Sequence, residues 1–310
     1  MHLNVYGSNM DLKYLDYERS RRVPNIVVDG SANASTVVTL SHWPGANAPD
    51  GLARDLSAEM AFAYLDNPSA HEDAGVVTNN HFDQDGLVSI FTLCQPEIAM
   101  AHREVLIDVA SAGDFGKYNE RRAAHASVVI AHWSDLGLGY EEALPRLMDL
   151  VTDPTPYRHI WEREDANLTA SEAAIVRGSI VITEMPEIDL AIVEISDDEP
   201  LTGGHRFAHE TFCGLHPMAL HNATDRFRIL VIAGNHYTYT DRYETWVQFQ
   251  SRPTLARRNM AALAQRLNQL ESGEWTAGSP DELVPTMTHT RESQLQRQQV
   301  VDELVAYLQS

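Results

Sequence analysis

Short runs of β-branched residues alternate with helix-like apolar repeats in the first third of the chain. Residues 25–28, 36–40 and 75–79 have the pattern of short strands that end at turn residues. Between the second and third runs, apolar residues recur every fourth position in 52–60, which indicates a helix. This alternation favours an α/β fold with a doubly wound, mostly parallel sheet. In such a fold, ligands gather at the carboxyl ends of the strands.

The second half of the chain follows a different order of elements. Residues 117–177 have a helical pattern, and Thr169–Glu172 within them match a capping box. Beyond them we expect strands at 180–182, 190–193, 226–232 and 237–249, and helices at 255–270 and 293–308. Gly234 and Asn235 separate the last two strands and indicate a hairpin. We therefore expect an α/β domain in residues 1–170 and a smaller α+β domain with an antiparallel sheet in residues 171–310.

The charge of the chain limits its partners. There are 44 acidic and 23 basic side chains, a formal net charge of −21, and no long run of Lys or Arg. Such a surface repels duplex nucleic acid and anionic lipid. The chain has no apolar run of membrane-spanning length and no pattern of a secretion signal at its N-terminus. For Cys94 and Cys213 we expect reduced thiols in a cytoplasmic protein rather than a disulfide, and a homodimer is among the assemblies left open.

One polar cluster follows the expected strand at 75–79. His81, Asp83 and Asp85 are spaced two residues apart, and Gly86 ends the cluster. Alternate side chains of an extended segment point the same way, so one imidazole and two carboxylates would converge. This set suits a divalent metal, of which Mn is the first choice and Mg and Zn remain open.

Two other interpretations of this cluster stay open. The aspartates would serve only as caps if a helix begins near Leu87, since carboxylates are favoured at helix N-termini. The string also has some likeness to an EF-hand loop, but Thr92 stands where that loop needs Glu.

The same cluster carries a family resemblance. Residues 81–89, after the strand at 76–78, resemble the first motif of the DHH phosphoesterase superfamily, an H-x-D-x-D-G-x-x-S pattern at the end of a parallel strand. The resemblance implies a manganese-dependent hydrolase with a metal domain, a smaller substrate domain and an active site in the cleft between them. It implies that His81, Asp83 and Asp85 are metal ligands. It also matches Asp108, at the end of an expected strand, to the family's metal-bridging aspartate.

The C-terminal half adds a further likeness. Residues 243–252 are similar to the strand with which such substrate domains hold phosphate, which would assign Ser251 and Arg252 to substrate binding. Gly203–His205 resembles the glycine-rich loop of the superfamily but precedes that strand instead of following it. The chain contains no Asp-His-His triplet, the third motif of the superfamily. As a whole, the chain also resembles a bacterial family of unknown function, through its strings at 41–45 and 221–226.

Other residues extend the candidate site. His42 follows the expected strand at 36–40 and would reach the same sheet edge as a further metal ligand, unless it is a surface loop histidine. Asp114, in a glycine-rich loop, is either a ligand or a turn residue. The string at 221–226 offers His221 and Asp225 as an acid/base pair and Asn222 and Arg226 as contacts for an anion. The other interpretation of that string is a hydrogen-bonded loop before a strand.

Several familiar enzyme motifs are missing. The chain has no G-x-G-x-x-G, no P-loop and no G-x-S-x-G. The function expected from the sequence is therefore a metal-dependent hydrolase, a phosphoesterase that acts on a small anionic molecule between two domains. A non-catalytic ligand-binding protein on a degenerate DHH-like scaffold and a metal-free hydrolase that uses His221 and Asp225 are the alternatives.

Overall fold

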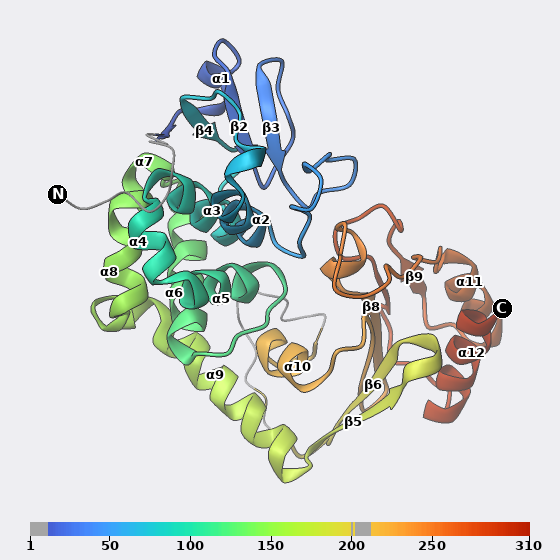
Figure 1. Cartoon of the computed structure of the whole chain (residues 1–310). Coiled ribbons are helices and arrows are strands. Elements are labelled where there is room, and N and C mark those ends of the chain that lie inside the picture. The colour runs from blue at the N-terminus through green and yellow to red at the C-terminus, as the bar shows by residue number, and fades with distance from the viewer. Residues whose placement is uncertain (1–11, 200, 202–211) are drawn as a thin grey trace. The chain divides into compact units, whose positions relative to one another are not determined.

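The computed structural model describes residues 12–199, 201 and 212–310, and it is a mixed α/β structure (Figure 1). The chain divides into two compact units. The first unit comprises Met1–Glu162 and Val247–Pro253, and the second comprises Arg163–Trp246 and Thr254–Ser310. The division lies within one long helix, α9 (Arg158–Arg177). The short segment Val247–Pro253, which returns to the first unit, has no counterpart in the division expected at residue 170.

A small parallel sheet organises the first unit. It has the order β1-β4-β2-β3, and every neighbouring pair is parallel. The strands are β1 (Lys13–Tyr14), β2 (Asn25–Val28), β3 (Thr36–Leu40) and β4 (Val76–Thr78). All four residues of β2 are buried, as expected for a central strand of a covered parallel sheet. The parallel α/β sheet predicted for the N-terminal half is confirmed.

Helices pack in sequence against this sheet and against each other. α3 (Gln84–Cys94) contacts β1, β2 and β4, and it also packs between α2 (Ser57–Asp66) and α5 (Arg103–Asp114). Nearly every residue of α3 is buried, because after the first turn its sequence is mostly apolar and interrupted only by the small polar residues Ser89 and Thr92. The other helices of this unit are α1 (Tyr17–Ser20), α4 (Pro96–Ala101), α6 (Arg121–Asp135), α7 (Tyr140–Ala143), α8 (Leu147–Thr152) and the short η1 (Pro68–Ala70), η2 (Leu144–Arg146) and η3 (Thr155–Tyr157).

Two local predictions for this region are wrong. The strand expected over residues 105–107 is part of helix α5. Its buried apolar residues are Val105, Leu106, Val109, Ala110 and Ala112, a spacing that follows the helical repeat rather than alternation. Thr169 does not begin a helix either, because α9 runs through it without interruption.

The second unit is built on a mixed sheet with the order β5-β6-β7-β8-β10-β9. Its strands are β5 (Ile180–Met185), β6 (Leu190–Ile195), β7 (Arg228–Ala233), β8 (His236–Asp241), β9 (Trp275–Ala277) and β10 (Thr286–His289). Neighbouring strands are antiparallel except β6 and β7, which are parallel. The β7–β8 hairpin predicted at Gly234 is confirmed, with that glycine at φ 55°.

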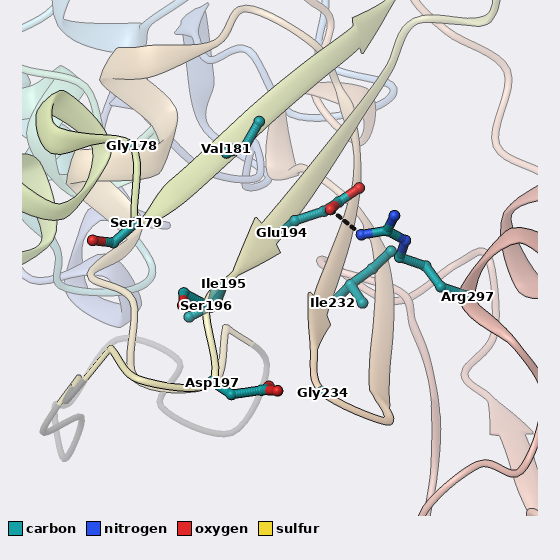
Figure 2. A pocket seen from close by; sticks show the side chains of 10 residues that line it. All are labelled: Gly178, Ser179, Val181, Glu194, Ile195, Ser196, Asp197, Ile232, Gly234 and Arg297. Atoms are coloured by element: carbon teal, nitrogen blue, oxygen red, sulfur yellow. Dashed lines mark hydrogen bonds and ion pairs between the residues drawn. The ribbon is translucent and has the colours of Figure 1, made fainter.

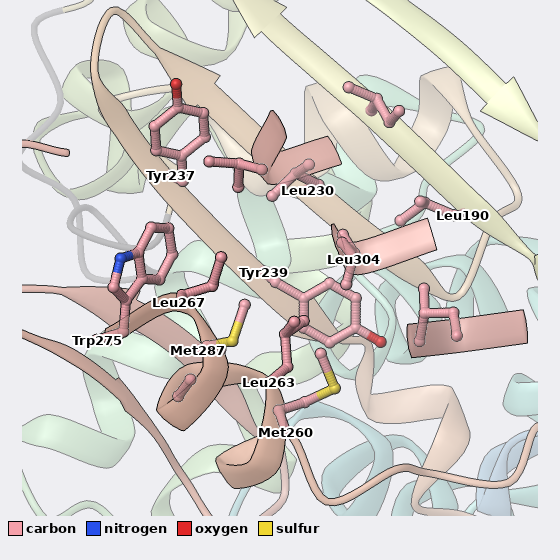
Figure 3. Close-up of a cluster of buried hydrophobic side chains, with 14 of the residues drawn as sticks. Leu190, Leu230, Tyr237, Tyr239, Met260, Leu263, Leu267, Trp275, Met287 and Leu304 are labelled. Atoms are coloured by element: carbon pink, nitrogen blue, oxygen red, sulfur yellow. The ribbon is translucent and has the colours of Figure 1, made fainter. Parts of the chain in front are cut away.

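The helices of this unit are α10 (Pro217–Ala223), α11 (Ala261–Leu270), α12 (Arg297–Gln309) and the short η4 (Pro186–Ile188) and η5 (Tyr243–Thr245). Leu263 and Leu267 of α11 and Leu304 of α12 pack with buried residues of the sheet in one apolar core (Figure 3). Tyr239, at the centre of β8, is buried in the same core. One face of the sheet and the two C-terminal helices, α11 and α12, therefore share a common apolar core.

The strand expected to run on to residue 249 is shorter than predicted. β8 ends at Asp241, where its pairing with β7 also ends. Buried Arg242 forms an ion pair with Glu244, and the chain turns into η5. Residues 243–252 are therefore not the strand that the phosphoesterase resemblance implied.

Two further observations concern the chain as a whole. Cys94 and Cys213 are both free thiols. Within the part of the chain that the structure describes, no helix combines the length and apolar character needed to cross a membrane.

Candidate metal centre

Three neighbouring strands of the parallel sheet deliver polar residues to one edge. Asp29 is the first residue after β2, His42 is the second residue after β3, and His81 is the third residue after β4. Because β4, β2 and β3 are adjacent and parallel, their carboxyl ends meet at this edge. Two helices complete the set: Asp83 and Asp85 lie at the start of α3, and Asp114 is the last residue of α5.

The first group of side chains is almost entirely buried. It consists of Asp29, His42, Asp85 and Asp114, with one ligand atom from each lying within 4.8 Å of the others. Nε2 of His42 is 3.5 Å from Oδ1 of Asp29 and 4.0 Å from Oδ2 of Asp85. The same nitrogen is 3.4 Å from Oδ2 of Asp114. One imidazole thus faces three carboxylates, and we call this the buried group.

The second group is partly open to solvent. It consists of Asp29, His81 and Asp83. Nε2 of His81 lies 2.7 Å from Oδ2 of Asp83 and 3.3 Å from Oδ2 of Asp29. The side chains of His81 and Asp83 are 28% and 30% exposed, so we call this the open group. Asp29 belongs to both groups and presents Oδ1 to one and Oδ2 to the other.

Asp29 was not predicted from the sequence, although it has a local signal. It is the first residue after a fully buried strand, and Gly30 follows it. Its φ of 45° lies in the left-handed region, which aspartate tolerates better than most residues. A Cβ on Gly30 would lie 2.1 Å from Oδ1 of Asn80, so a larger residue after this aspartate would require the Asn80 side chain to move. An Asp-Gly pair at the end of a parallel strand is therefore the pattern that would have found it.

Hydrogen bonds from neighbouring segments hold these side chains in place. Nδ1 of His42 is 2.6 Å from the backbone oxygen of Asp55, which turns Nε2 toward the carboxylates. Oδ2 and Oδ1 of Asp85 accept hydrogen bonds from the backbone N–H groups of Ser57 and Ala58, at 2.8 and 2.7 Å. Asp85 therefore caps α2.

Asp83 also combines two roles. Its Oδ1 accepts a hydrogen bond from the backbone N–H of Gly86 at 2.8 Å, which caps α3. Its Oδ2 faces His81 in the open group. Helix capping and a cluster of potential ligands, which the sequence presented as alternatives, are both present in this geometry.

For two carboxylates of the buried group, the surroundings disfavour the charged form. Burial and the nearby charge of Asp83 raise the pKa of Asp29 to about 6. Burial and the charge of Asp29 raise the pKa of Asp85 to about 8. In the described part of the chain, the ion-pair partners of these two aspartates are histidines rather than lysines or arginines. Two buried like charges favour a proton or a cation between them.

In the open group, the surroundings favour the charged forms of His81 and Asp83. Burial works against a charge on His81, but the carboxylates of Asp83 and Asp29 outweigh it and raise the pKa of His81 to about 10. Burial works against the charge of Asp83 too, but the charge of His81 and its hydrogen bond lower the pKa of Asp83. Oδ2 of Asp29 nevertheless has no hydrogen bond of good geometry from any described residue, although Asp29 is only 1% exposed. The imidazole of His81, 3.3 Å away, is an ion-pair partner of this oxygen, and a buried carboxylate oxygen without a well-formed hydrogen bond favours a cation beside it.

Asp108 does not join either group. It lies in the middle of α5, six residues before Asp114, which corresponds to about 9 Å along a helix. Its carboxylate accepts hydrogen bonds from the backbone N–H groups of Asn119 and Glu120, both at 2.7 Å. Asp108 therefore anchors the turn before α6. The expectation that Asp108 stands at a strand end is therefore wrong, because Asp108 lies within α5 and belongs to neither group.

The candidate residues of the string at 221–226 lie in the second unit and belong to neither group. His221 and Asn222 are in α10, and Asp225 follows in the loop before β7. Arg226 forms ion pairs with Glu184 at 3.3 Å and Asp189 at 3.6 Å.

Ser251 and Arg252 were expected on the substrate domain, but they lie in the segment Val247–Pro253 of the first unit. The backbone N–H of Gln248 donates to the carbonyl of His42 at 2.7 Å. The backbone N–H groups of Gln250 and Ser251 donate to Oδ1 of Asp55 at 2.5 and 2.9 Å. This segment thus supports the loop that carries His42. Gly203–His205 lie outside the described residues.

A separate pocket of about 420 Å³ lies in the second unit (Figure 2). An ion pair between Glu194 and Arg297 crosses one side of it, and Ser179, Ser196 and Asp197 are among the residues that line it. Its lining includes none of the candidate catalytic, substrate-binding or metal-ligating residues named from the sequence. The histidine and aspartate groups of the first unit are therefore the stronger candidate site.

The fold and this geometry define an α/β protein with a cluster of aspartates and histidines at the carboxyl edge of a parallel sheet. The chain belongs to DUF6687, a family of unknown function whose profile matches residues 10–306. This agrees with the resemblance of the whole chain to a family of unknown function. A search of curated proteins finds no match.

Proposed function

We propose that this protein is a metal-dependent hydrolase whose centre holds two divalent cations bridged by Asp29. The observation that carries the proposal is the shared, buried carboxylate of Asp29, which presents one oxygen to each group. The four aspartates carry as much negative charge as two divalent cations balance. Oxygen and imidazole nitrogen are donors that suit Mn²⁺, with Mg²⁺ and Zn²⁺ as alternatives.

The two groups suggest different roles for the two ions. All ligand candidates of the buried group come from well-packed elements, which is typical of an ion that holds the structure of a site. The open group has fewer protein ligands and two partly exposed side chains, His81 and Asp83. Open coordination positions are the feature of a catalytic metal. We therefore place the substrate on the side of His81.

The chemistry follows from a bound cation next to a partly open side. A divalent metal lowers the pKa of water to supply a nucleophile and offsets negative charge in the transition state. A small phosphorylated or otherwise anionic substrate matches such a centre, since the cations counter the acidic surroundings. In this proposal His81, Asp83 and Asp29 would hold the ion on the substrate side, and His42, Asp85, Asp114 and the shared Asp29 would hold the buried ion.

The likeness to DHH phosphoesterases is compatible with this class of reaction. The first motif, with His81, Asp83 and Asp85, follows a parallel strand as the likeness requires. Asp29 takes the bridging position that the likeness assigned to Asp108. The missing Asp-His-His triplet favours a second candidate, a metal-binding protein that holds an anionic ligand without hydrolysing it.

Hydrolysis of generic phosphoesters separates these candidates. The protein, purified without an affinity metal and loaded with Mn²⁺, is assayed with 4-nitrophenyl phosphate and bis(4-nitrophenyl) phosphate. We expect turnover that requires Mn²⁺, that Asp29→Asn abolishes and that Asp108→Asn retains. Metal binding without turnover of any phosphoester would support the non-catalytic candidate. Equal turnover with and without metal would contradict the proposed centre and leave the metal-free pair His221 and Asp225 to be tested.

A further inference from the structure

One buried serine contacts three of the proposed ligand residues, two through its hydroxyl and one through its backbone N–H. Ser57 is the first residue of α2 and is fully buried. Its Oγ–H donates to Oδ1 of Asp29 at 3.0 Å, and its Oγ accepts the backbone N–H of His42 at 3.3 Å. Its own backbone N–H donates to Oδ2 of Asp85 at 2.8 Å.

The two kinds of contact have different consequences. The backbone N–H bond to Asp85 survives any substitution of Ser57 except proline. The hydroxyl contact to Asp29 depends on the side chain. The terminal torsion of an aspartate is broad, so its carboxylate rotates readily unless hydrogen bonds fix it. In this structure, the hydroxyl of Ser57 is the hydrogen-bond donor on Oδ1, while Oδ2 faces His81.

We propose that Ser57 is a positioning residue of the two-ion centre, whose hydroxyl fixes the carboxylate of Asp29 so that each oxygen serves one ion. The inference rests on the proposed function and adds a residue outside the ligand set. Partners that hold metal ligands tune affinity strongly, and their loss typically lowers it by about 10- to 100-fold. Loss of the hydroxyl is expected to affect the second, open-group ion most, because within the described residues that ion would have three candidate ligands and the buried ion four.

The test is a Mn²⁺ titration of the whole chain followed by electron paramagnetic resonance. Free Mn²⁺ gives the number and affinity of bound ions, and a carboxylate-bridged pair gives an exchange-coupled spectrum. We expect two ions and a coupled spectrum for the wild type. For Ser57→Ala we expect the second ion to bind at least about 10-fold more weakly and the coupled spectrum to disappear.

Two further variants keep the test decisive. Ser57→Thr retains the hydroxyl and is expected to retain the second ion and the coupled spectrum. Ser20→Ala removes another fully buried hydroxyl of the first unit, on α1, and is expected to behave as the wild type. Folded Ser57→Ala with two ions bound within twofold of wild-type affinity would overturn the role of Ser57 and leave the two-ion centre standing. Absence of Mn²⁺ binding by the wild type would overturn both.

Discussion

The side chains around Asp29 come from segments that are distant from it in the sequence. His81, Asp83 and Asp85 were found from their spacing, His42 from its position after an expected strand, and Asp114 from its glycine-rich surroundings. The structure brings all five close to Asp29. Asp29 itself was missed because a single Asp-Gly after a strand is also an ordinary turn signal. Its contacts with His42, His81 and Ser57 come from segments 13 to 52 residues away, which a local pattern does not reveal.

Replacing Asp29 with asparagine distinguishes the effect of its charge on folding stability from its role in metal binding. The raised pKa of this buried carboxyl means that its charged form is less stable in the folded protein than in the unfolded chain. For metal-free Asp29→Asn at pH 8 we therefore expect a Tm at or above that of the wild type. The same variant should lose the stabilisation by Mn²⁺, because both groups lose their shared ligand. Calorimetry with and without Mn²⁺ measures both effects, and a variant stabilised by Mn²⁺ as much as the wild type would exclude Asp29 as a ligand.

The pH dependence of the metal-free protein follows from the same groups. Asp29 and Asp85 have folded pKa values raised to about 6 and about 8, so the stability they contribute is complete below their unfolded pKa near 4. That stability is lost as pH rises through about 6 and about 8. A bound cation removes this loss, so we expect the increase in Tm caused by Mn²⁺ to be larger at pH 8 than at pH 5.5. An increase that is equal at both pH values, or larger at the lower one, would argue against these two carboxylates as ligands.

Proton release on binding gives an independent check. The pKa of His81 is raised to about 10, so this imidazole carries a proton at pH 8 in the metal-free protein. A metal ligand must give that proton up. Calorimetric titrations of Mn²⁺ in buffers with different ionisation enthalpies should therefore show net proton release at pH 8, reduced in His81→Gln.

At the scale of elements, the type of most segments was predictable and their ends were less so. The parallel strands at 25–28 and 36–40 and the β7–β8 hairpin were predicted because β-branched runs and turn residues are local signals. Residues 105–107 were misassigned because a short apolar run fits a buried strand and a buried helix equally well. Packing of α5 between α3 and α6 decides for the helix. That single difference moves Asp108 away from the sheet edge and brings Asp114 to it.

The altered role of Asp108 has a measurable consequence. Asp108→Ala removes the acceptor of the backbone N–H groups of Asn119 and Glu120 at the start of α6. We expect a loss of about 1–3 kcal/mol in the free energy of unfolding, measured by urea denaturation, because these donors lose a charged partner. Mn²⁺ affinity should stay within a few-fold of the wild type. A loss of Mn²⁺ binding by the folded variant would return Asp108 to the ligand set.

For the whole molecule, the sequence predicted two domains but not which segments of the chain belong to each unit. The structural division lies within α9 at Glu162, where helical periodicity continues without a break and composition gives no signal. The return of Val247–Pro253 to the first unit is a tertiary effect, made by hydrogen bonds from Gln248 and Ser251 to the loop of His42 and to Asp55. Ser251 and Arg252 therefore lie in the first unit, which also carries the histidine and aspartate groups. They do not lie in the second unit, which is built on the mixed sheet.

The central claim is that one chain binds two divalent cations through a shared Asp29. The most direct measurement is elemental analysis of the whole protein after equilibration with Mn²⁺ and removal of free metal. We expect two Mn²⁺ per wild-type chain, with both ions lost in Asp29→Asn and both kept in Asp108→Asn. A wild-type chain without bound Mn²⁺, or an Asp29→Asn chain that still holds two ions, would contradict it.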